Sequence, residues 1–232
     1  MINTPDSDPR LPATLTTNRM FEDGNEFCDA YGSKHHDLSV LHINARSIKH
    51  RDKFCEFLTF VESFNNELDI IIVSESWLSE SDPLHMYNIN GYSSEFWCRR
   101  GQVGGGLVVY ISENLTYNRL TGLKIGNCEE GWIELKTRSS ESILMGALYR
   151  PPNFSVKEFS DGIEKFGRDL ENARVRCILV GDMNINLYTN NEYMNVLQSA
   201  GFTSLISQPT RSAAQSASNI DHVYVNAEMQ DY

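Results

Sequence analysis

The sequence lacks a long hydrophobic run. None of its apolar stretches approaches the roughly 20 residues that a membrane-spanning helix needs. Residues 1–20 also contain no apolar core of the kind found in a secretory signal. These two absences argue against helical membrane spans and favour a protein that makes no membrane contact.

Cysteine is also scarce. The five cysteines stand at positions 28, 55, 98, 128 and 177, an odd number without any Cys-x-x-Cys spacing. This pattern argues against a disulfide framework and against a zinc site. It favours a reducing, intracellular setting, either the nucleus or the cytoplasm.

Positive charge is in short supply. Lysine and arginine total 20 against 31 acidic residues, which gives a net charge of −11. Nucleic-acid binding normally needs basic patches, so this balance is unexpected for a protein that contacts phosphates. Residues 46–53 nevertheless form a basic cluster, which can be interpreted as a solvated helix start or as a nucleic-acid contact.

The remaining composition suits a folded domain. Hydrophobic residues make up 41% of the chain and aromatic residues 10%, enough for a substantial core. Residues 1–36 are polar and contain three prolines, so we expect a disordered leader there. Residues 37–232 are expected to form one domain.

Hydrophobic periodicity predicts more strands than helices. Strands are expected at 37–44, 70–73, 107–111, 131–136, 142–148, 177–180, 202–206 and 220–226. Helices are expected after Ser47, which we predict to be an N-cap residue, at 156–170, and in a short segment around 193–197. Residues 91–100 and 212–219 are predicted to be loops. This arrangement indicates an α/β sandwich with helices outside the sheets.

One stretch dominates the interpretation. The apolar run that begins at Cys177 ends in Gly181, and Asp182 and Asn184 follow it. Gly, Asp and Asn are turn formers, so a simple turn is one interpretation. The other is a hydrolytic site at a strand end, where the carboxylate handles a proton and the amide holds an oxyanion or phosphate oxygen.

Further polar side chains follow other predicted strands. Asn44 and Glu75 each stand at the carboxyl end of a strand, as Asp182 does. Such ends meet at one rim of a sheet, so we expect these three to cluster with Tyr149, Asn184 and Asp221. Glu75 and Asn44 offer oxygen ligands that suit Mg²⁺. Tyr149 can be interpreted as a core residue or as a phenol that faces a phosphate.

The glycine run at 101–106 suggests a phosphate-binding loop. However, neither Lys-Ser/Thr nor a helix follows it, so neither nucleotide-binding motif fits. We therefore predict a close approach of the backbone to a strand.

The motifs, taken in order, resemble those of a known family. They are Asn-Ala-Arg-Ser (44–47), Ser-Glu-Ser-Trp-Leu (74–78), Gly-Gly-Gly-Leu-Val-Val-Tyr-Ile (104–111), Tyr-Arg-Pro-Pro (149–152), Gly-Asp-Met-Asn (181–184), Gln-Pro-Thr-Arg (208–211) and Ile-Asp-His-Val (220–223). Over residues 37–226 the chain resembles the endonuclease/exonuclease/phosphatase superfamily. Within it, the chain is most similar to the apurinic-type endonuclease domain of non-LTR (LINE-like) retrotransposon polyproteins.

This resemblance implies a four-layered α/β sandwich of two mixed sheets flanked by helices. It implies DNA phosphodiester cleavage that depends on Mg²⁺, with Mn²⁺ as an alternative. DNA is then the partner, together with a reverse transcriptase domain in the parent polyprotein. The implied metal ligands are Glu75 and Asn44, and the implied catalytic residues are Asp182, Asn184, Tyr149 and Asp221. The substrate-binding candidates are Arg46, Arg150 and Thr210.

Within that resemblance the roles are distinct. Tyr149 would contact the scissile phosphate and Asp182 would activate the attacking water. Asn184 would hold a phosphate oxygen or the nucleophile, and Asp221 would orient the catalytic histidine.

The chain departs from the family pattern in one respect. The family ends in a further strand that carries Ser-Asp-His, and no such motif follows Ile220-Asp221-His222. We therefore expect truncation before the last strand, an exposed sheet edge, and impaired activity. His222 is expected to be structural rather than catalytic.

Three functional hypotheses follow. The first is a DNA endonuclease. The second is a phosphatase that acts on a small phosphate ester or lipid, against which the Tyr-Arg-Pro-Pro and Pro-Thr-Arg motifs speak. The third is a non-catalytic retroelement remnant or interaction module, which the net acidity and the missing motif support.

Overall fold

A computed structural model describes residues 38–64, 68–99, 101, 104–136, 141–213 and 216–229. The predicted disordered leader at 1–36 lies outside the described residues. Within the described part of the chain, no helix is both long enough and apolar enough to cross a membrane.

The first sheet has four strands in the order β1-β2-β4-β3. Their bounds are Val40–Asn44 (β1), Ile70–Ser74 (β2), Leu107–Ser112 (β4) and Tyr92–Trp97 (β3). β1 and β2 run parallel, and the other two pairs are antiparallel. β1 forms one edge, and no described strand pairs with its other side.

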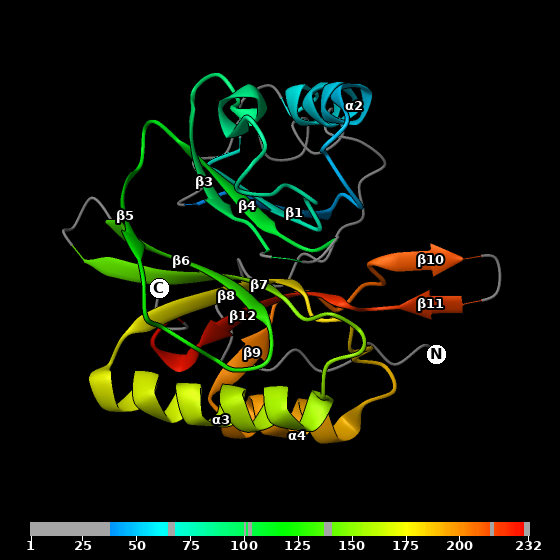
Figure 1. Cartoon of the computed structure of the whole chain (residues 1–232). Coiled ribbons are helices and arrows are strands. Elements are labelled where there is room, and N and C mark those ends of the chain that lie inside the picture. Colours follow the sequence, from blue (N-terminus) through cyan, green and yellow to red (C-terminus); the bar gives the residue numbers. More distant parts are fainter. Residues whose placement is uncertain are drawn as a thin grey trace, which may run out of the picture.

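The second sheet has six strands in the order β5-β6-β7-β8-β12-β9. Their bounds are Thr116–Leu120 (β5), Glu129–Lys136 (β6), Ser142–Tyr149 (β7), Arg176–Asp182 (β8), Asp221–Asn226 (β12) and Phe202–Ser204 (β9). Among its described pairs, only β7 and β8 run parallel. β10 (Arg211–Ala213) and β11 (Ser216–Ser218) form a separate hairpin that projects from the body (Figure 1).

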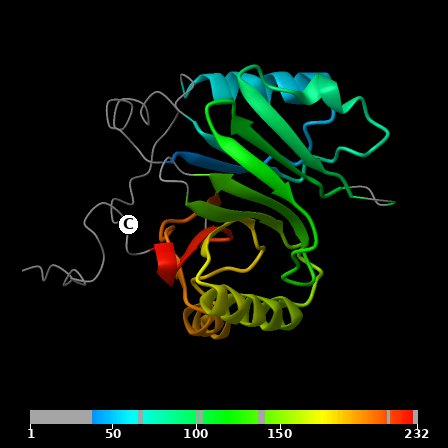
Figure 2. The same cartoon turned by 90° about the vertical axis from the view of Figure 1, so that its left-hand side faces the viewer.

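The two sheets pack face to face between helices. Helix α2 (Arg51–Glu62) covers the outer face of the first sheet, and α3 (Val156–Ala173) and α4 (Asn191–Ser199) cover the second (Figures 1 and 2). Two short 3₁₀ helices are also present, η1 (Leu84–Tyr87) between β2 and β3 and η2 (Ala227–Met229) after β12. The predicted four-layered sandwich is therefore confirmed.

Burial on both faces explains the uninterrupted apolar strands. In β2, Ile71 and Val73 pack in the cluster beneath α2, whereas Ile70 and Ile72 pack between the two sheets. A strand covered on both sides reads as a continuous apolar run rather than as an alternation. The same holds for β8, which is buried from Cys177 to Asp182.

The start of the first helix differs from the prediction. Helix α2 begins at Arg51 with His50 at its N-cap, and no side chain caps it. Ser47 has a φ of 94°, and its backbone N–H donates to the Glu75 carbonyl at 2.7 Å. This turn holds Ser47 away from the helix, so the predicted N-cap is wrong. Ser155, by contrast, caps α3 by accepting from the Glu158 N–H.

Two predicted loops are strands. Residues 91–100 contain β3, and residues 212–219 contain most of the β10–β11 hairpin. β3 is an edge strand whose residues after Tyr92 are only partly buried. Its middle residues, Ser93, Ser94 and Glu95, give no apolar alternation, and its ladder with β4 depends on backbone hydrogen bonds. Hydrophobic periodicity cannot detect such a strand.

Gly181 allows β7 and β8 to approach closely. The strand continues through it to Asp182 rather than leaving the sheet there. A Cβ atom at Gly181 would lie 1.8 Å from the Leu148 carbonyl oxygen on β7, and the residue has a φ of 154°. Only glycine fits this position without a shift of the backbone.

We expect Gly181→Ala to lower the free energy of unfolding by at least about 3 kcal/mol, because the new methyl group collides with backbone. Gly122→Ala is the matched control. Gly122 also has a left-handed φ of 88°, but open space surrounds it, so only about 1 kcal/mol is expected there. Urea unfolding of both variants measures the difference, and equal losses would contradict the close approach.

Candidate active site

The predicted cluster of polar strand ends is present. Asn44 ends β1 and Glu75 follows β2, while Asp182 ends β8. In the second sheet, Asp182 is paired in register with Tyr149 on β7 and with Asp221 on β12. The strand registers therefore bring residues distant in sequence to one end of the sandwich.

The amide group of Asn44 connects a carboxylate of each sheet at this end. Asn44 Nδ2 donates to Glu75 Oε1 at 2.8 Å and to Asp182 Oδ2 at 2.7 Å. An amide nitrogen carries two hydrogens, so both are used. Asn44 Oδ1 accepts the Arg46 N–H at 3.2 Å, which leaves the amide oriented from both ends.

The two aspartates share a desolvated environment. Asp182 is fully buried, and burial raises the pKa of its carboxyl group, with the charge of Asp221 adding to the effect. Hydrogen bonds from Asn44 and from the Asn184 N–H, the latter 2.8 Å from Asp182 Oδ1, act in the opposite direction. Burial also raises the pKa of Asp221, and the Arg211 cation opposes that rise.

His42 is a site residue that the sequence reasoning missed. Its Nδ1 lies 3.5 Å from Asp221 Oδ1, and its Nε2 lies 3.1 Å from Ser74 Oγ. Burial lowers the pKa of His42 to about 4. A signal was available, because residues two apart on a strand share a face and His42 stands two before Asn44.

Thr210 supports the start of β12. Its Oγ1 accepts the N–H groups of Ile220 and Asp221, each at 3.1 Å. The residue is exposed at the base of the β10–β11 hairpin. It therefore fixes the backbone from which the Asp221 carboxylate emerges.

Tyr149 lies beside Glu75 within the cluster. Burial, followed by the nearby Glu75 charge and its hydrogen bond, raises the pKa of the phenol well above its usual range. Opposite Tyr149 in the β6–β7 ladder stands Glu129, a second residue that sequence reasoning missed. Glu129 accepts the Gly106 N–H at 2.5 Å and pairs with Arg99.

Arg150 requires a correction. It was predicted to bind substrate, but it is only 1% exposed. Its Nε donates to the Met183 carbonyl at 2.7 Å and its Nη2 to the Asn184 carbonyl at 2.8 Å, while Nη1 contacts the carbonyls of Pro151 and Phe154. The guanidinium is thus occupied in holding the backbone that follows Asp182.

Asn184 contacts Arg150 through both its backbone and its side chain. Its Nδ2 donates to the Arg150 carbonyl at 3.0 Å, and its backbone adopts a left-handed φ of 49°. One amide hydrogen and the side-chain oxygen remain for other partners. The turn that follows β8 is therefore also an organised part of the site.

Gly105 and Gly106 pack against the loop that carries Glu75, so the predicted close approach of the backbone is to a loop rather than to a strand. A Cβ at Gly106 would lie 2.7 Å from Ser76 Oγ. The Ser76 N–H donates to the Gly106 carbonyl at 3.1 Å, and the Trp77 N–H donates to the Gly105 carbonyl at 2.9 Å. The described end of the run is therefore a close approach between two backbone segments.

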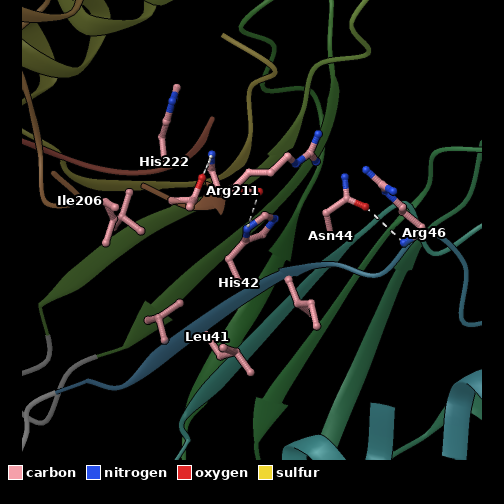
Figure 3. Close-up of a pocket in the computed structure, with 12 residues that line it drawn as sticks. Leu41, His42, Asn44, Arg46, Ile206, Arg211 and His222 are labelled. Carbon is pink, nitrogen blue, oxygen red and sulfur yellow. Dashed lines mark hydrogen bonds and ion pairs between the residues drawn. The ribbon is translucent and has the colours of Figure 1, made fainter. Parts of the chain in front are cut away.

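A groove of about 500 Å³ opens beside the cluster. All five residues of β1 line it, and Asp221, Arg46 and Arg211 lie around it. In Figure 3 the Arg211 side chain extends past His42 toward Asn44 and Arg46. The groove therefore combines carboxylate chemistry with two exposed cations.

The donor set suits a hard divalent cation. Asp221 Oδ1 is buried without a hydrogen-bond partner among the described residues, and no ion pair there joins Glu75 or Asp182 to lysine or arginine. Among the described residues there is no group of three or more His, Cys, Asp or Glu side chains that could bind a metal ion by themselves. Mg²⁺ needs only one or two carboxylates and keeps its waters, so an open site of this kind fits it.

The fold is a two-sheet α/β sandwich with an acidic cluster at its strand ends. The model of the endonuclease/exonuclease/phosphatase family matches residues 41–230. The chain belongs to this family. No curated protein matches the chain at a significant level.

Solved structures share the fold. The endonuclease domain of TRAS1, a telomere-specific non-LTR retrotransposon, is 15% identical with a TM-score of 0.61, covering 84% of this chain and 87% of its own. The Xenopus laevis APE2 catalytic domain is 14% identical with a TM-score of 0.59 and covers 83% of both chains. A variant of the 3′ phosphatase NExo from Neisseria, bound to product DNA hairpin, is 13% identical with a TM-score of 0.56, covering 84% and 88%.

We expect Arg150→Lys to lower the free energy of unfolding by about 3 kcal/mol, because lysine cannot replace the buried fork of hydrogen bonds. Arg46→Lys is the matched control on an exposed side chain, with a change within about 0.5 kcal/mol. Urea unfolding measures both. Full stability of Arg150→Lys would return this residue to the list of substrate-binding candidates.

His222 generates a pH dependence of stability. It is 1% exposed, its Nε2 lies 3.1 Å from the Asn219 carbonyl, and burial lowers its pKa to about 4. The unfolded chain binds the proton near pH 6.5 and the folded chain does not. As pH falls from 6.5 to 4, this residue alone should therefore remove about 3 kcal/mol of stability.

His222→Gln tests this expectation. Unfolding free energies of the variant, measured from pH 8 to pH 4, should fall less steeply than those of the wild type, whatever its stability at pH 8. Parallel curves would show that His222 is not the buried neutral histidine described here.

Proposed function

We propose that this protein is a Mg²⁺-dependent phosphodiester hydrolase that nicks DNA and derives from a non-LTR retrotransposon endonuclease. The observation that carries the proposal is the Asn44 amide, which holds Glu75 and Asp182 together where the two sheets meet. The Asn44 amide binds one oxygen of each carboxylate. The other oxygen of Glu75 can then bind a cation, and the other oxygen of Asp182 can accept a proton.

In this proposal Glu75 and Asn44 hold the divalent cation, Mg²⁺ or alternatively Mn²⁺. The cation supplies charge stabilisation at the phosphate when it is bound. Asp182 accepts the proton of the attacking water, for which its raised pKa is suited. Asp221 keeps His42 oriented beside it.

The phosphate is held by neutral and cationic groups. Tyr149 keeps its proton because burial and the Glu75 charge raise its pKa, so the phenol is a hydrogen-bond donor to a phosphate oxygen. Asn184 has one free amide hydrogen for the same purpose. Arg46 and Thr210 are the substrate-contacting residues at the groove, and Arg211 adds a second cation there.

DNA is the proposed substrate for two reasons. A Neisseria protein of the same fold has been captured with a DNA hairpin, and the TRAS1 domain is an endonuclease. The exposed cations of this chain, Arg46 and Arg211, lie at the groove beside the carboxylates. In the retroelement setting, a reverse transcriptase domain is the proposed partner, and the nucleus or cytoplasm is the proposed compartment.

Nicking of supercoiled plasmid with Mg²⁺ tests the proposal. Glu75→Gln and Asp182→Asn should each reduce the nicking rate at least about a hundredfold, because each removes a charge needed for catalysis. Glu134→Gln is the matched control, since Glu134 pairs with Lys136 away from the site. Its rate should equal that of the wild type.

The outcomes separate the hypotheses. Equal nicking by all four proteins would contradict the assigned site. Hydrolysis of a phosphomonoester without plasmid nicking would favour a phosphatase. A folded protein that hydrolyses neither substrate would support a non-catalytic remnant or interaction module.

A further inference from the structure

Trp77 combines exposure with an unusual backbone conformation. Its side chain is 40% exposed, although tryptophan is the largest apolar residue. Its φ is 59°, in the left-handed region that bulky residues rarely adopt. It stands two residues after Glu75, so its Cα lies within about 7 Å of the Glu75 Cα.

Backbone segments next to Trp77 hold it in this conformation. The Trp77 N–H donates to the Gly105 carbonyl at 2.9 Å, and the Leu78 N–H approaches Ser76 Oγ at 3.4 Å. Gly104, Gly105 and Gly106 themselves have φ values of 89°, 69° and 84°, so this loop can lie flat against the tryptophan turn. Backbone strain that surrounding structure enforces in this way is typical of functional positions.

A cationic turn stands on the other side of Glu75. The Ser47 N–H donates to the Glu75 carbonyl at 2.7 Å and the Ile48 N–H to the Ser76 carbonyl at 3.0 Å. These bonds place Arg46, which is exposed and has a φ of 46°, on the segment next to the tryptophan turn. Arg46 and Trp77 therefore stand on the two backbone segments that adjoin the residue proposed to hold the cation.

We propose that Trp77 is a nucleobase-stacking subsite, on which a base next to the cleaved phosphate lies against the indole face. The proposal rests on the proposed nuclease function and names the part of the substrate that is bound beside Glu75. The indole of Trp77 would bind the base of a nucleotide, and the nearby Arg46 cation would bind its phosphate. Base–aromatic stacking tolerates every base, so the subsite would contribute affinity rather than sequence preference.

The other exposed large apolar side chains of the described residues lack this combination. They are Phe60, Met86 and Tyr188. Phe60 on α2 packs edge to face on Phe64, which lies just beyond the end of the helix, and Tyr188 donates to the Ser207 carbonyl at 2.8 Å. None of the three has a left-handed φ, and none adjoins a catalytic carboxylate in sequence. Single exposed apolar residues of that kind are ordinary.

Fluorescence quenching can report mainly on this residue. The chain has three tryptophans. Trp132 is 2% exposed, and Trp97 is covered by the Arg119 guanidinium at 4.3 Å from its ring centroid. Acrylamide quenching should therefore come mainly from Trp77. Added oligonucleotide should quench the emission and protect it from acrylamide, and Trp77→Phe should lose both effects.

Affinity is measured in an Asp182→Asn background with Mg²⁺ present, so that no cleavage occurs under the proposed mechanism. Trp77→Ala should weaken the binding of a 12-nucleotide oligo-dT about tenfold or more, whereas Trp77→Phe should retain most of the affinity. For an abasic phosphodiester oligomer of equal length, Trp77→Ala should change nothing. An equal loss on both oligomers would attribute the effect to folding or phosphate contacts and overturn the inference.

A second pair of variants tests the strain. Trp77→Gly and Trp77→Ala both remove the indole, but only glycine accepts the left-handed φ freely. The Gly variant should therefore melt about 2–4 °C above the Ala variant, while both bind oligo-dT equally weakly. Tighter binding by either variant than by the parent would contradict the subsite.

Failure of the inference differs from failure of the proposed function. If Glu75→Gln abolishes nicking while Trp77→Ala leaves oligo-dT affinity unchanged, the stacking subsite is wrong and the nuclease assignment stands. If the protein neither nicks nor binds oligo-dT, both are wrong.

Discussion

The site depends on the amide of Asn44. At one end of the sandwich this one nitrogen donates to a carboxylate from each sheet, 2.8 Å to Glu75 in its own sheet and 2.7 Å to Asp182 across the apolar interface. Each carboxylate belongs to a different sheet, so the bonds also set the distance between them. Two negative charges can lie this close in a buried place only with such donors, or a cation, between them.

Around this amide the backbone is held in uncommon conformations. Of the six described residues other than glycine with positive φ, five lie in the turns that carry the site: Arg46, Ser47, Glu75, Trp77 and Asn184. The turns stabilise one another, since the turn at Ser47 bonds to the turn at Glu75, which rests on the glycine loop. The buried strands on both sides supply the stability that such strained turns require.

The sequence predicted those parts of the molecule that depend on local pattern. The apolar runs of β2 and β8 identified the central strands, and polar residues at their ends identified the rim. β3 was missed because an edge strand of serine and glutamate has no apolar alternation. Arg150 was misassigned because the direction of its side chain depends on carbonyls more than 30 residues away, at Met183 and Asn184. Such long-range contacts leave no local signal.

Net charge constrains how an acidic protein can bind a polyanion. At −11 the long-range field of the chain opposes the approach of DNA, so steering by charge is not available to it. For the proposed DNA substrate, binding would then come from contacts at short range: the cations Arg46 and Arg211 at the groove, the divalent cation proposed at Glu75 and Asn44, and apolar surface that is indifferent to charge. In the proposed subsite the exposed Trp77 indole supplies this apolar surface, and stacking is the interaction that net charge weakens least. The acidity of the chain therefore makes an aromatic contact at this place more important.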